Sequence, residues 1–467
     1  MKYTKELLKK FGIENWSAAA TPMSYSGKLQ KDDDGQSVDI TAYIGIIEMV
    51  EMFESLEISG LRKFLGGPVI IHEPEVHEFF EPARIIGDRI ILVLFVEHSG
   101  IRKVILNRPE KLNSLNYEMI NEIFRKLKAY EDDSSVNLVI LKGNGKAFSA
   151  GGDVTDMISN ITAGNWSIVT KFYANQLCID HLIATYHKPL VSIVNGLVMG
   201  GGAGLSIHAC FRVVTENTVF SMPEAAIGLF PDVGASFFLS RLSDSFGEYL
   251  GLTGAKLDGA EMLACGLATH FVLSKDLASM ESELDVLGSY GHTNISEVSR
   301  TINKYAHNPL LKKGSPYLRL NVIDQCFSRE TVEDILSSLV SFLLHKLEKW
   351  VIDAINSINS ASPTSLKLFL RLIRKGRIQN LEDCLVREYT VISHVASRSL
   401  SDDLFEGARA MLIVKDKKPE WDPSRLELVK DEFIDKYFDN MDDDDFKPLR
   451  LPPRTKPTWC TNLRSNI

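Results

Sequence analysis

The sequence predicts an α/β fold, in which a spiral of repeated ββα units is followed by a helical C-terminal region. The first observation is that short β-branched runs, typical of buried strands, alternate with stretches whose apolar residues have helical spacing. The second is that the apolar spacing is helical throughout 332–358 and 365–374. The predicted strands are 137–141, 189–194 and 211–215, and the helices that alternate with them are 166–186, 201–209 and 234–242.

The regular pattern begins near Arg89 with two strands and a helix. Residues 90–96 and 101–106 are apolar, β-branched runs, and the His98-Ser99-Gly100 segment between them predicts a β-hairpin. Residues 117–130 then have the spacing of an amphipathic helix. Its predicted buried residues are Met119, Ile120, Ile123, Phe124 and Leu127.

A helical cap is expected to begin after this core. Asp258 is followed three residues later by Glu261, a pairing that is typical of a helix start. Met262, Leu263 and Leu267 then fall on one face of a helix, so residues 258–270 are expected to open the cap.

Composition and charge exclude several classes of partner. The chain has 467 residues, of which 45% are hydrophobic, and its net charge is −9. An acidic balance argues against nucleic acid as a partner, because phosphate binding needs a basic face. No apolar run approaches the ~20 residues of a membrane span, so no membrane partner is expected. The histidines show no metal-ligand spacing and predict no metal site.

The cysteines lie far apart in the sequence, without a C-x-x-C pair, and mostly within apolar runs. They are therefore expected to be buried thiols in a reducing compartment rather than disulfides or zinc ligands. The six are Cys178, Cys210, Cys265, Cys326, Cys384 and Cys460.

Two glycine-rich segments follow predicted strands and indicate acyl-group chemistry. Residues 147–153 end in Gly151-Gly152-Asp153, and Gly200-Gly201-Gly202 follows the run at 189–194 and a short connection. Two such loops at strand ends can present two backbone N–H groups to one oxygen, which is the geometry of an oxyanion hole. Glu224 and Asp232, eight residues apart, can act on the same centre as base and positioning group.

Each carboxylate also has a structural interpretation. Glu224 follows Pro223 among apolar residues, so desolvation is expected to raise its pKa, but it could instead satisfy backbone donors at a helix start. Asp232 precedes Val233-Gly234 at a predicted helix start and could be an N-cap residue.

The order of these motifs resembles the crotonase (enoyl-CoA hydratase/isomerase) superfamily, and within it the plant type of 3-hydroxyisobutyryl-CoA hydrolase. The resemblance extends from about Leu92 to Pro453. It implies a crotonase-like spiral fold and hydrolysis of the thioester of 3-hydroxyisobutyryl-CoA, or a close β-hydroxyacyl-CoA, in valine catabolism. The motifs are Leu106-Asn107-Arg108-Pro109, Phe148-Ser149-Ala150-Gly151-Gly152-Asp153, Met199-Gly200-Gly201-Gly202-Ala203-Gly204, Gly228-Leu229-Phe230-Pro231-Asp232, Ser362-Pro363-Thr364-Ser365 and Glu406-Gly407-Ala408-Arg409.

The resemblance also implies roles for individual residues. The backbone N–H groups of Gly152 and Gly201 would form the oxyanion hole for the thioester oxygen. Glu224 would be the base or nucleophile toward the acyl carbon, and Asp232 would bind the substrate hydroxyl or the attacking water. No cofactor is implied, because CoA is part of the substrate. The resemblance is also compatible with a homo-oligomer, and it implies a peroxisomal or mitochondrial location.

CoA would lie along two segments of the chain. At one substrate-binding position, Gln176, this chain differs from the family. The expected CoA-binding residues are Lys111, Leu112, Lys146 and Ala150. The family usually has a glutamate near the substrate where this chain has Gln176. An amide keeps a hydrogen bond but cannot act as a base.

Two alternatives remain open at this point. Crotonase-type hydratases carry a glutamate where this chain has Gly204, and glycine where it has Asp232, so these two residues argue against a hydratase or isomerase. A non-catalytic binding or assembly protein with the same fold is favoured by Gln176, whereas the intact glycine loops and Glu224 argue against it.

The chain is divided into four predicted parts. The first 45 residues resemble a fragment of a copia-type retrotransposon polymerase, and residues 46–61 predict an amphipathic helix. The acidic run 442–445 is interpreted as solvated, and neither end shows a targeting signal, so a cytosolic location is also possible. The parts are an atypical extension at 1–90, interpreted as a fusion or gene-model artefact, a crotonase-like catalytic core at 91–290, a helical C-terminal region at 291–453 and a tail at 454–467.

Overall fold

The computed structural model describes residues 85–86, 89–289, 294–441, 446–455 and 457. The predicted helix at 46–61, the acidic run 442–445 and Cys460 lie outside the described residues. The boundaries of the four predicted parts of the chain stay a prediction.

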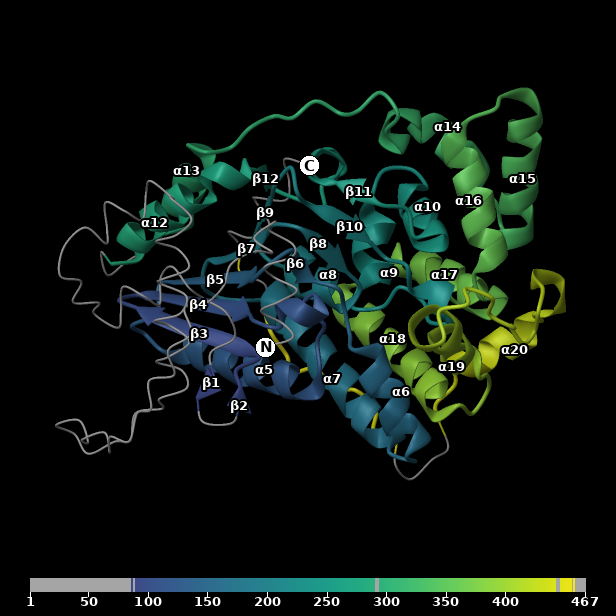
Figure 1. Ribbon diagram of the computed structural model, residues 1–467, viewed down its shortest axis with the longest axis horizontal. Coiled ribbons are helices and arrows are strands. Elements are labelled where there is room, and N and C mark those ends of the chain that lie inside the picture. The colour runs from purple at the N-terminus through teal and green to yellow at the C-terminus, as the bar shows by residue number, and fades with distance from the viewer. Residues whose placement is uncertain (1–84, 87–88, 290–293, 442–445, 456, 458–467) are drawn as a thin grey trace, which may run out of the picture. The chain divides into compact units, whose positions relative to one another are not determined.

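Two sheets form the centre of the fold (Figure 1). The larger has six strands in the order β12-β9-β7-β5-β4-β3, and the smaller has four in the order β11-β10-β8-β6. A separate pair, β1 (Ile85–Ile86) and β2 (Arg89–Ile90), is antiparallel. The larger sheet contains β3 (Val93–His98), β4 (Ile101–Leu106), β5 (Leu138–Gly143), β7 (Leu190–Val194), β9 (Phe211–Val214) and β12 (His270–Phe271), and the smaller contains β6 (Ala147–Ser149), β8 (Leu197–Met199), β10 (Val219–Ser221) and β11 (Leu257–Asp258).

Three successive strand pairs build both sheets, which confirms the predicted ββα repeat. In the pairs β5–β6, β7–β8 and β9–β10, the first strand joins the larger sheet and the second joins the smaller one. The first strands run parallel, with Val139 opposite Leu190 and Val191 opposite Phe211. Because parallel strands are covered on both faces, they need the continuous β-branched runs seen in the sequence. The second strand of each pair therefore lies in the same smaller sheet.

The helices cover these sheets and then form a separate C-terminal layer (Figure 1). Helix α7 contacts α5, α6, α8 and α18, so it links the core to the C-terminal layer. The first helices are α5 (Tyr117–Asp132), α6 (Val154–Thr162), α7 (Trp166–Ala184), α8 (Gly201–Ile207), α9 (Ala235–Phe238), α10 (Phe246–Thr253), α11 (Gly259–Ala264), α12 (Leu277–Gly288) and α13 (Ile295–Asn303). The C-terminal helices are α14 (Leu320–Phe327), α15 (Val332–His345), α16 (Lys349–Ser360), α17 (Pro363–Gly376), α18 (Leu381–Ser397), α19 (Asp403–Ala408) and α20 (Asp431–Asp435).

The hairpin and the amphipathic helix predicted at the start of the core are confirmed. β3 pairs antiparallel with β4, from Val93 opposite Leu106 to His98 opposite Ile101, although the first strand begins three residues later than predicted. α5 buries four of the five predicted apolar residues, and Phe124 is half-buried.

Two helical predictions were too long. The helical run 332–358 is divided into α15 and α16, because Glu348 leaves the helix and accepts bonds from Arg319 and from the indole of Trp350. The cap prediction at 258–270 is right only at its start. Asp258 and Glu261 form a complete capping box for α11, but the chain then enters β12.

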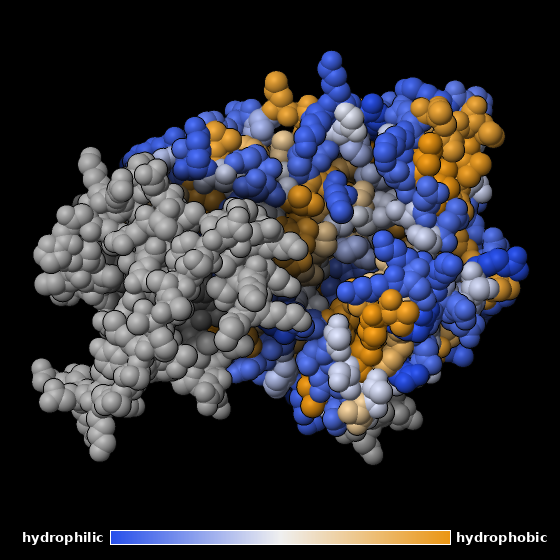
Figure 2. Space-filling model, viewed as in Figure 1, coloured by the Kyte–Doolittle hydropathy of each residue, from blue (hydrophilic) through white to orange (hydrophobic). Residues whose placement is uncertain are grey.

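The five cysteines within the described part of the chain are free thiols, four of them buried. No helix in that part is both long and apolar enough to cross a bilayer. Apolar residues gather on the surface over α15 (Figure 2). Leu344 in the last turn of this helix and Leu347 just after it are both exposed.

Candidate active site

The first glycine loop is fixed by a backbone bridge to Leu115. The amide of Leu115 donates to the carbonyl of Gly151 at 2.8 Å, and the amide of Asp153 donates to the carbonyl of Leu115 at 2.8 Å. Because both neighbours of Gly152 bond to Leu115, the N–H of Gly152 points to the opposite side, as alternate residues do in extended chain. Arg108 holds the end of the loop through a 2.8 Å ion pair with Asp153.

The second glycine turn joins β8 to α8 and lies against Glu224. Gly200 has a φ of 47°, and a Cβ placed on it would meet Oε1 of Glu224 at 2.7 Å. Gly201 is the first residue of α8, so its N–H has no acceptor within the helix. Only glycine at position 200 lets the Glu224 carboxyl group approach the turn this closely.

The two glycine loops bring their amides together. A Cβ built on Gly201 would lie 3.5 Å from the amide nitrogen of Gly152, and one built on Gly151 would lie 3.4 Å from the amide nitrogen of Gly201. Neither the Gly152 nor the Gly201 amide donates to an acceptor within the described residues. Two adjacent N–H groups without protein partners can bind one oxygen that gains negative charge.

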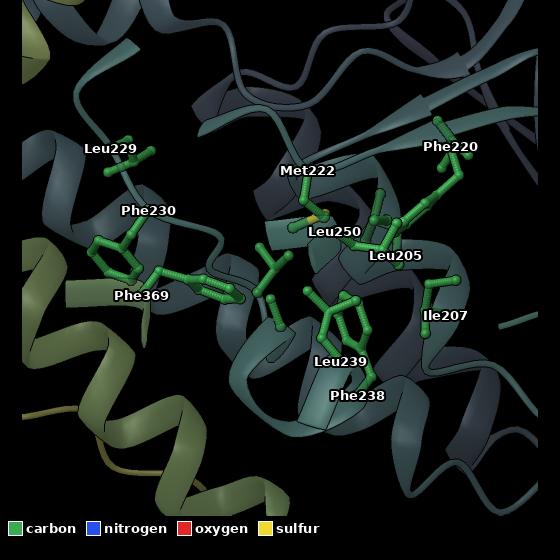
Figure 3. Packing of buried hydrophobic residues seen from close by; sticks show 14 of the residues in the cluster. Leu205, Ile207, Phe220, Met222, Leu229, Phe230, Phe238, Leu239, Leu250 and Phe369 are labelled. Carbon is green, nitrogen blue, oxygen red and sulfur yellow. The ribbon is translucent and has the colours of Figure 1, made fainter. Parts of the chain in front are cut away.

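Glu224 is buried beside these amides, and its carboxyl group is only partly hydrogen-bonded within the described residues. It begins a 3-10 helix, Glu224–Ile227, directly after Pro223. Its side chain is 6% exposed, and its Oε2 has no hydrogen-bond partner among the described residues. The neighbouring Met222, Leu229 and Phe230 belong to the hydrophobic core (Figure 3). A buried carboxyl oxygen without a partner is costly and therefore marks a candidate functional group.

Asp232 lies on a strained turn. Val233, which follows it, has a φ of 55°, a conformation that β-branched residues rarely adopt, and Gly234 has a φ of 81°. The Nε2 atom of His208 lies 2.9 Å from the carbonyl oxygen of Val233 and holds this turn. Strain of this kind costs about 1–3 kcal/mol and persists where the surrounding structure enforces it.

The interpretation of Asp232 as an N-cap residue is wrong. The N-cap position of α9 is Gly234, and no side chain at that position caps the helix. Glu388 of α18 does so instead, because its carboxylate accepts from the amide of Gly234 at 2.7 Å and from the amide of Ser236 at 3.0 Å. The hydroxyl of Ser236 donates to it as well, at 2.6 Å. Glu388 therefore accepts the hydrogen bonds of the amides at the start of α9, and the Asp232 carboxyl group is not needed as their acceptor.

Burial raises the pKa of both candidate carboxyl groups. Desolvation raises the pKa of Glu224 to about 8, as expected from its apolar neighbours. Desolvation, followed by repulsion from Glu224 and Glu388, raises the pKa of Asp232 well above its usual range. Two carboxyl groups in one buried site titrate as a pair. Burial therefore disfavours the ionised form of both carboxyl groups, and their mutual repulsion opposes the ionisation of both at once.

Helix α7 adds a polar face to the site. Tyr173, Gln176 and Asp180 are spaced three and four residues apart, which places them on one side of the helix. Their exposed fractions are 5, 1 and 0%. Desolvation, followed by the charges of Asp232 and Glu224, raises the pKa of Tyr173. The sequence interpretation included Gln176 but missed the other two, although polar residues at helical spacing in an apolar helix were a usable signal.

The four residues expected to bind CoA lie on two segments that are joined by a backbone hydrogen bond. The amide of Ala150 donates to the carbonyl of Leu112 at 2.9 Å. Lys111, Leu112 and Lys146 are exposed, and neither lysine has an ion-pair partner among the described residues. The structure therefore brings the predicted CoA-binding residues together on one surface and leaves two ammonium groups available for phosphate.

Asn113 fixes these two segments, a role that the sequence interpretation did not assign to it. Its Nδ2 donates to the carbonyls of Asn144 and Ala147, each at 2.8 Å, and its own carbonyl accepts from the Ser149 hydroxyl at 2.9 Å. Asn113 has a φ of 54°, which asparagine tolerates better than most residues.

Known proteins resemble this chain over most of its length. Residues 101–438 match the model of the enoyl-CoA hydratase/isomerase family. The chain is 50% identical over 362 residues to 3-hydroxyisobutyryl-CoA hydrolase 1 of Arabidopsis thaliana, which covers 78% of this chain and 94% of that protein. It is 40% identical over 363 residues to the mitochondrial 3-hydroxyisobutyryl-CoA hydrolase of Gallus gallus, with 76% and 90% covered. A solved carnitinyl-CoA dehydratase from Mycobacterium thermoresistibile is 32% identical, with a TM-score of 0.69 and 77% and 98% covered.

The Glu388 cap yields a stability prediction. In Glu388→Ala, the amides of Gly234 and Ser236 lose their acceptor, at a cost of about 1–3 kcal/mol for each buried donor. We expect the free energy of unfolding to fall by at least about 2 kcal/mol in urea titrations. The control is Asp383→Ala, an exposed acidic residue on the same helix, which should change little. Equal unfolding midpoints for the two variants would contradict the role given to Glu388.

Proposed function

The chain belongs to the enoyl-CoA hydratase/isomerase family, and from this premise we propose that it hydrolyses 3-hydroxyisobutyryl-CoA, or a close β-hydroxyacyl-CoA, to the free acid and CoA. Its fold is crotonase-like, as the sequence predicts. Relatives named 3-hydroxyisobutyryl-CoA hydrolase match about three quarters of the chain. It is an acyl-CoA thioester hydrolase, and the reaction belongs to valine catabolism.

The observation that carries this proposal is the Glu224 carboxyl group beside two unpartnered amides. A thioester oxygen bound by the N–H groups of Gly152 and Gly201 would place the acyl carbon next to Glu224. Charge that develops on that oxygen is then stabilised in a site from which water is largely excluded, where such interactions are strongest. Burial also favours the reaction, because it makes the ionised carboxylate of Glu224 more basic than that of an exposed glutamate.

Two routes fit this arrangement. As a nucleophile, the Glu224 carboxylate attacks the acyl carbon, and the C–S bond breaks with CoA leaving as the thiolate. Water then cleaves the mixed anhydride, which releases the acid and the Glu224 carboxylate, and the proton lost by the water passes to the thiolate. As a base, Glu224 takes a proton from a water that attacks the same carbon, the C–S bond breaks, and that proton passes to the sulfur of the departing CoA. In both routes the Asp232 carboxyl group, whose pKa is raised by burial, would bind the substrate hydroxyl or the attacking water.

The geometry does not favour the hydratase alternative. A hydratase needs a second glutamate at position 204, but a Cβ there would meet Cβ of Val233 at 2.7 Å and Oδ1 of Asp180 at 2.8 Å. The space is therefore already filled by the Asp232 turn and by α7. The carboxyl pair of this chain consists of Glu224 and Asp232, a different arrangement around the acyl carbon.

The remaining features of the function are proposals from the resemblance. CoA would bind along Leu112 and Ala150, with Lys111 and Lys146 as phosphate partners. The reaction requires no cofactor, because the thioester itself supplies the leaving group. Self-association and a mitochondrial or peroxisomal location are proposed on the same basis, and a relative in Gallus gallus is named as mitochondrial.

Two substitutions separate the roles of the carboxyl groups. Glu224→Ala should abolish nearly all thioester hydrolysis while CoA still binds, because the glycine loops and lysines are untouched. Asp232→Asn should lower kcat more than it changes KM if the acid acts in the transition state. Steady-state hydrolysis, with thermal melts to confirm folding, measures both. An active Glu224→Ala enzyme would show that the site is wrongly assigned.

The raised pKa of Glu224 predicts a pH profile. Because Glu224 must be ionised to act, kcat/KM should rise with pH and level off above about 8. The folded state holds a proton that the unfolded state releases above its ordinary pKa of 4.5, so stability should fall as pH rises from about 4.5 to 8. Glu224→Gln should remove that part of the slope in urea titrations. A kcat/KM that is already constant near pH 6 would contradict the role of burial.

A further inference from the structure

The turn that carries Asp232 is held by His208, the residue directly after α8. Nε2 of His208 donates to the carbonyl oxygen of Val233 at 2.9 Å, because a carbonyl oxygen can only accept. His208 is 2% exposed, and its ring meets that of Phe238 edge-on, with 5.8 Å between the ring centres. This buried contact holds Val233 in the left-handed conformation that its branched side chain disfavours.

Glycine at position 234 makes room for the imidazole. A Cβ on Gly234 would lie 2.8 Å from both Cε1 and Nε2 of His208, so the ring packs directly against the backbone of the turn. From α18, Glu388 accepts a hydrogen bond from the Gly234 amide at 2.7 Å. Both contacts are made to the backbone that follows Asp232. The turn is therefore held by two other elements, and the Asp232 side chain takes no part in either contact.

Helix α8 connects the His208 contact to the oxyanion turn. Its first residue is Gly201, whose amide has no acceptor within the described residues, and His208 is its C-cap. Midway along the helix, a Cβ on Gly204 would meet Cβ of Val233 at 2.7 Å, so Val233 also packs against the backbone of α8. Because successive backbone hydrogen bonds make a helix stiff, α8 sets the separation between the Gly201 amide and the Asp232 turn.

We propose that His208 is a positioning residue, which fixes the Asp232 carboxyl group at the separation from the oxyanion amides that the reaction requires. This inference rests on the proposed function, because it gives His208 an effect on the same reaction through Asp232. Without the bond from His208, Val233 loses a contact that enforces its strained conformation and can relax. Asp232, one residue earlier, then shifts relative to the bound thioester, and a small displacement of a reacting group lowers the rate even when the fold is intact.

A double-mutant cycle in the full-length chain separates positioning from stability. His208→Ala should lower kcat for 3-hydroxyisobutyryl-CoA by at least about tenfold, with a smaller change in KM. His208→Gln keeps a side-chain N–H donor at a similar reach, so it should restore most of that rate. In an Asp232→Asn background, His208→Ala should lower kcat by less than about twofold, because the group that His208 positions is already altered.

His394 offers a matched control outside the site. It is also buried, its Nε2 lies 3.0 Å from the carbonyl oxygen of Asp439, and its ring meets that of Tyr437 edge-on. His394→Ala therefore removes the same kind of contact as His208→Ala. It should lower the midpoint of urea unfolding in the same way but leave kcat nearly unchanged.

Three outcomes overturn the inference. An equal loss of kcat in His394→Ala, or independent losses in the two arms of the cycle, would show that His208 acts only through stability. A His208→Gln enzyme as slow as His208→Ala would show that the N–H donor is not what matters. If His208→Ala does not fold, His208→Asn, whose shorter amide does not reach the Val233 carbonyl, replaces it in the cycle.

Failure of the proposed function is distinguishable from failure of this inference. If the wild type does not hydrolyse 3-hydroxyisobutyryl-CoA, the proposed function fails. The dissociation constants of the same thioester, measured by calorimetry, then replace kcat in the cycle with His208 and Asp232. A smaller effect of His208→Ala in the Asp232→Asn background still supports the positioning role, whereas independent effects overturn it.

Discussion

Glu224 and Asp232 are almost fully withdrawn from water, and most other features of the structure serve to keep them so. Two buried carboxyl groups repel each other and lose hydration, which is unfavourable unless the surroundings enforce their position. Here the glycine at position 200 lets one of them reach the oxyanion turn, and the left-handed Val233 holds the other. The same burial raises the pKa of Glu224 toward the range in which a base or nucleophile is effective.

The C-terminal helices enforce this arrangement from outside the core. The amide of Ser362 donates to the carbonyl of Ala225 at 3.0 Å, directly behind Glu224. A Cβ on Gly228 would lie 2.1 Å from the carbonyl oxygen of Asp403, so α19 is in close contact with the end of the same turn. Glu388 completes the enclosure at the start of α9. The helical region therefore packs directly against the segments that carry Glu224 and Asp232, and most of it lies within residues 101–438, which match the family model.

Local sequence patterns predicted the features that depend on neighbouring residues. The ββα repeat, the hairpin, the capping box at Asp258 and the apolar surroundings of Glu224 all follow from runs of a few residues. Glu388 could not be predicted in this way, because it caps a helix that begins more than 150 residues earlier. The break between α15 and α16 was missed for a similar reason, since Glu348 bonds to Arg319 outside either helix. Asp180 was missed although its helical spacing from Gln176 was a usable signal, and only its contact with Gly204 required the structure.

The central claim is that this carboxyl pair acts on the thioester carbonyl rather than on a carbon–carbon double bond. The most direct measurement uses one preparation of the full chain and follows thiol release from 3-hydroxyisobutyryl-CoA and hydration of crotonyl-CoA in parallel. The structure predicts release of CoA with no measurable hydration, because position 204 has no room for the second hydratase carboxylate. Hydration of crotonyl-CoA without release of CoA would contradict the claim.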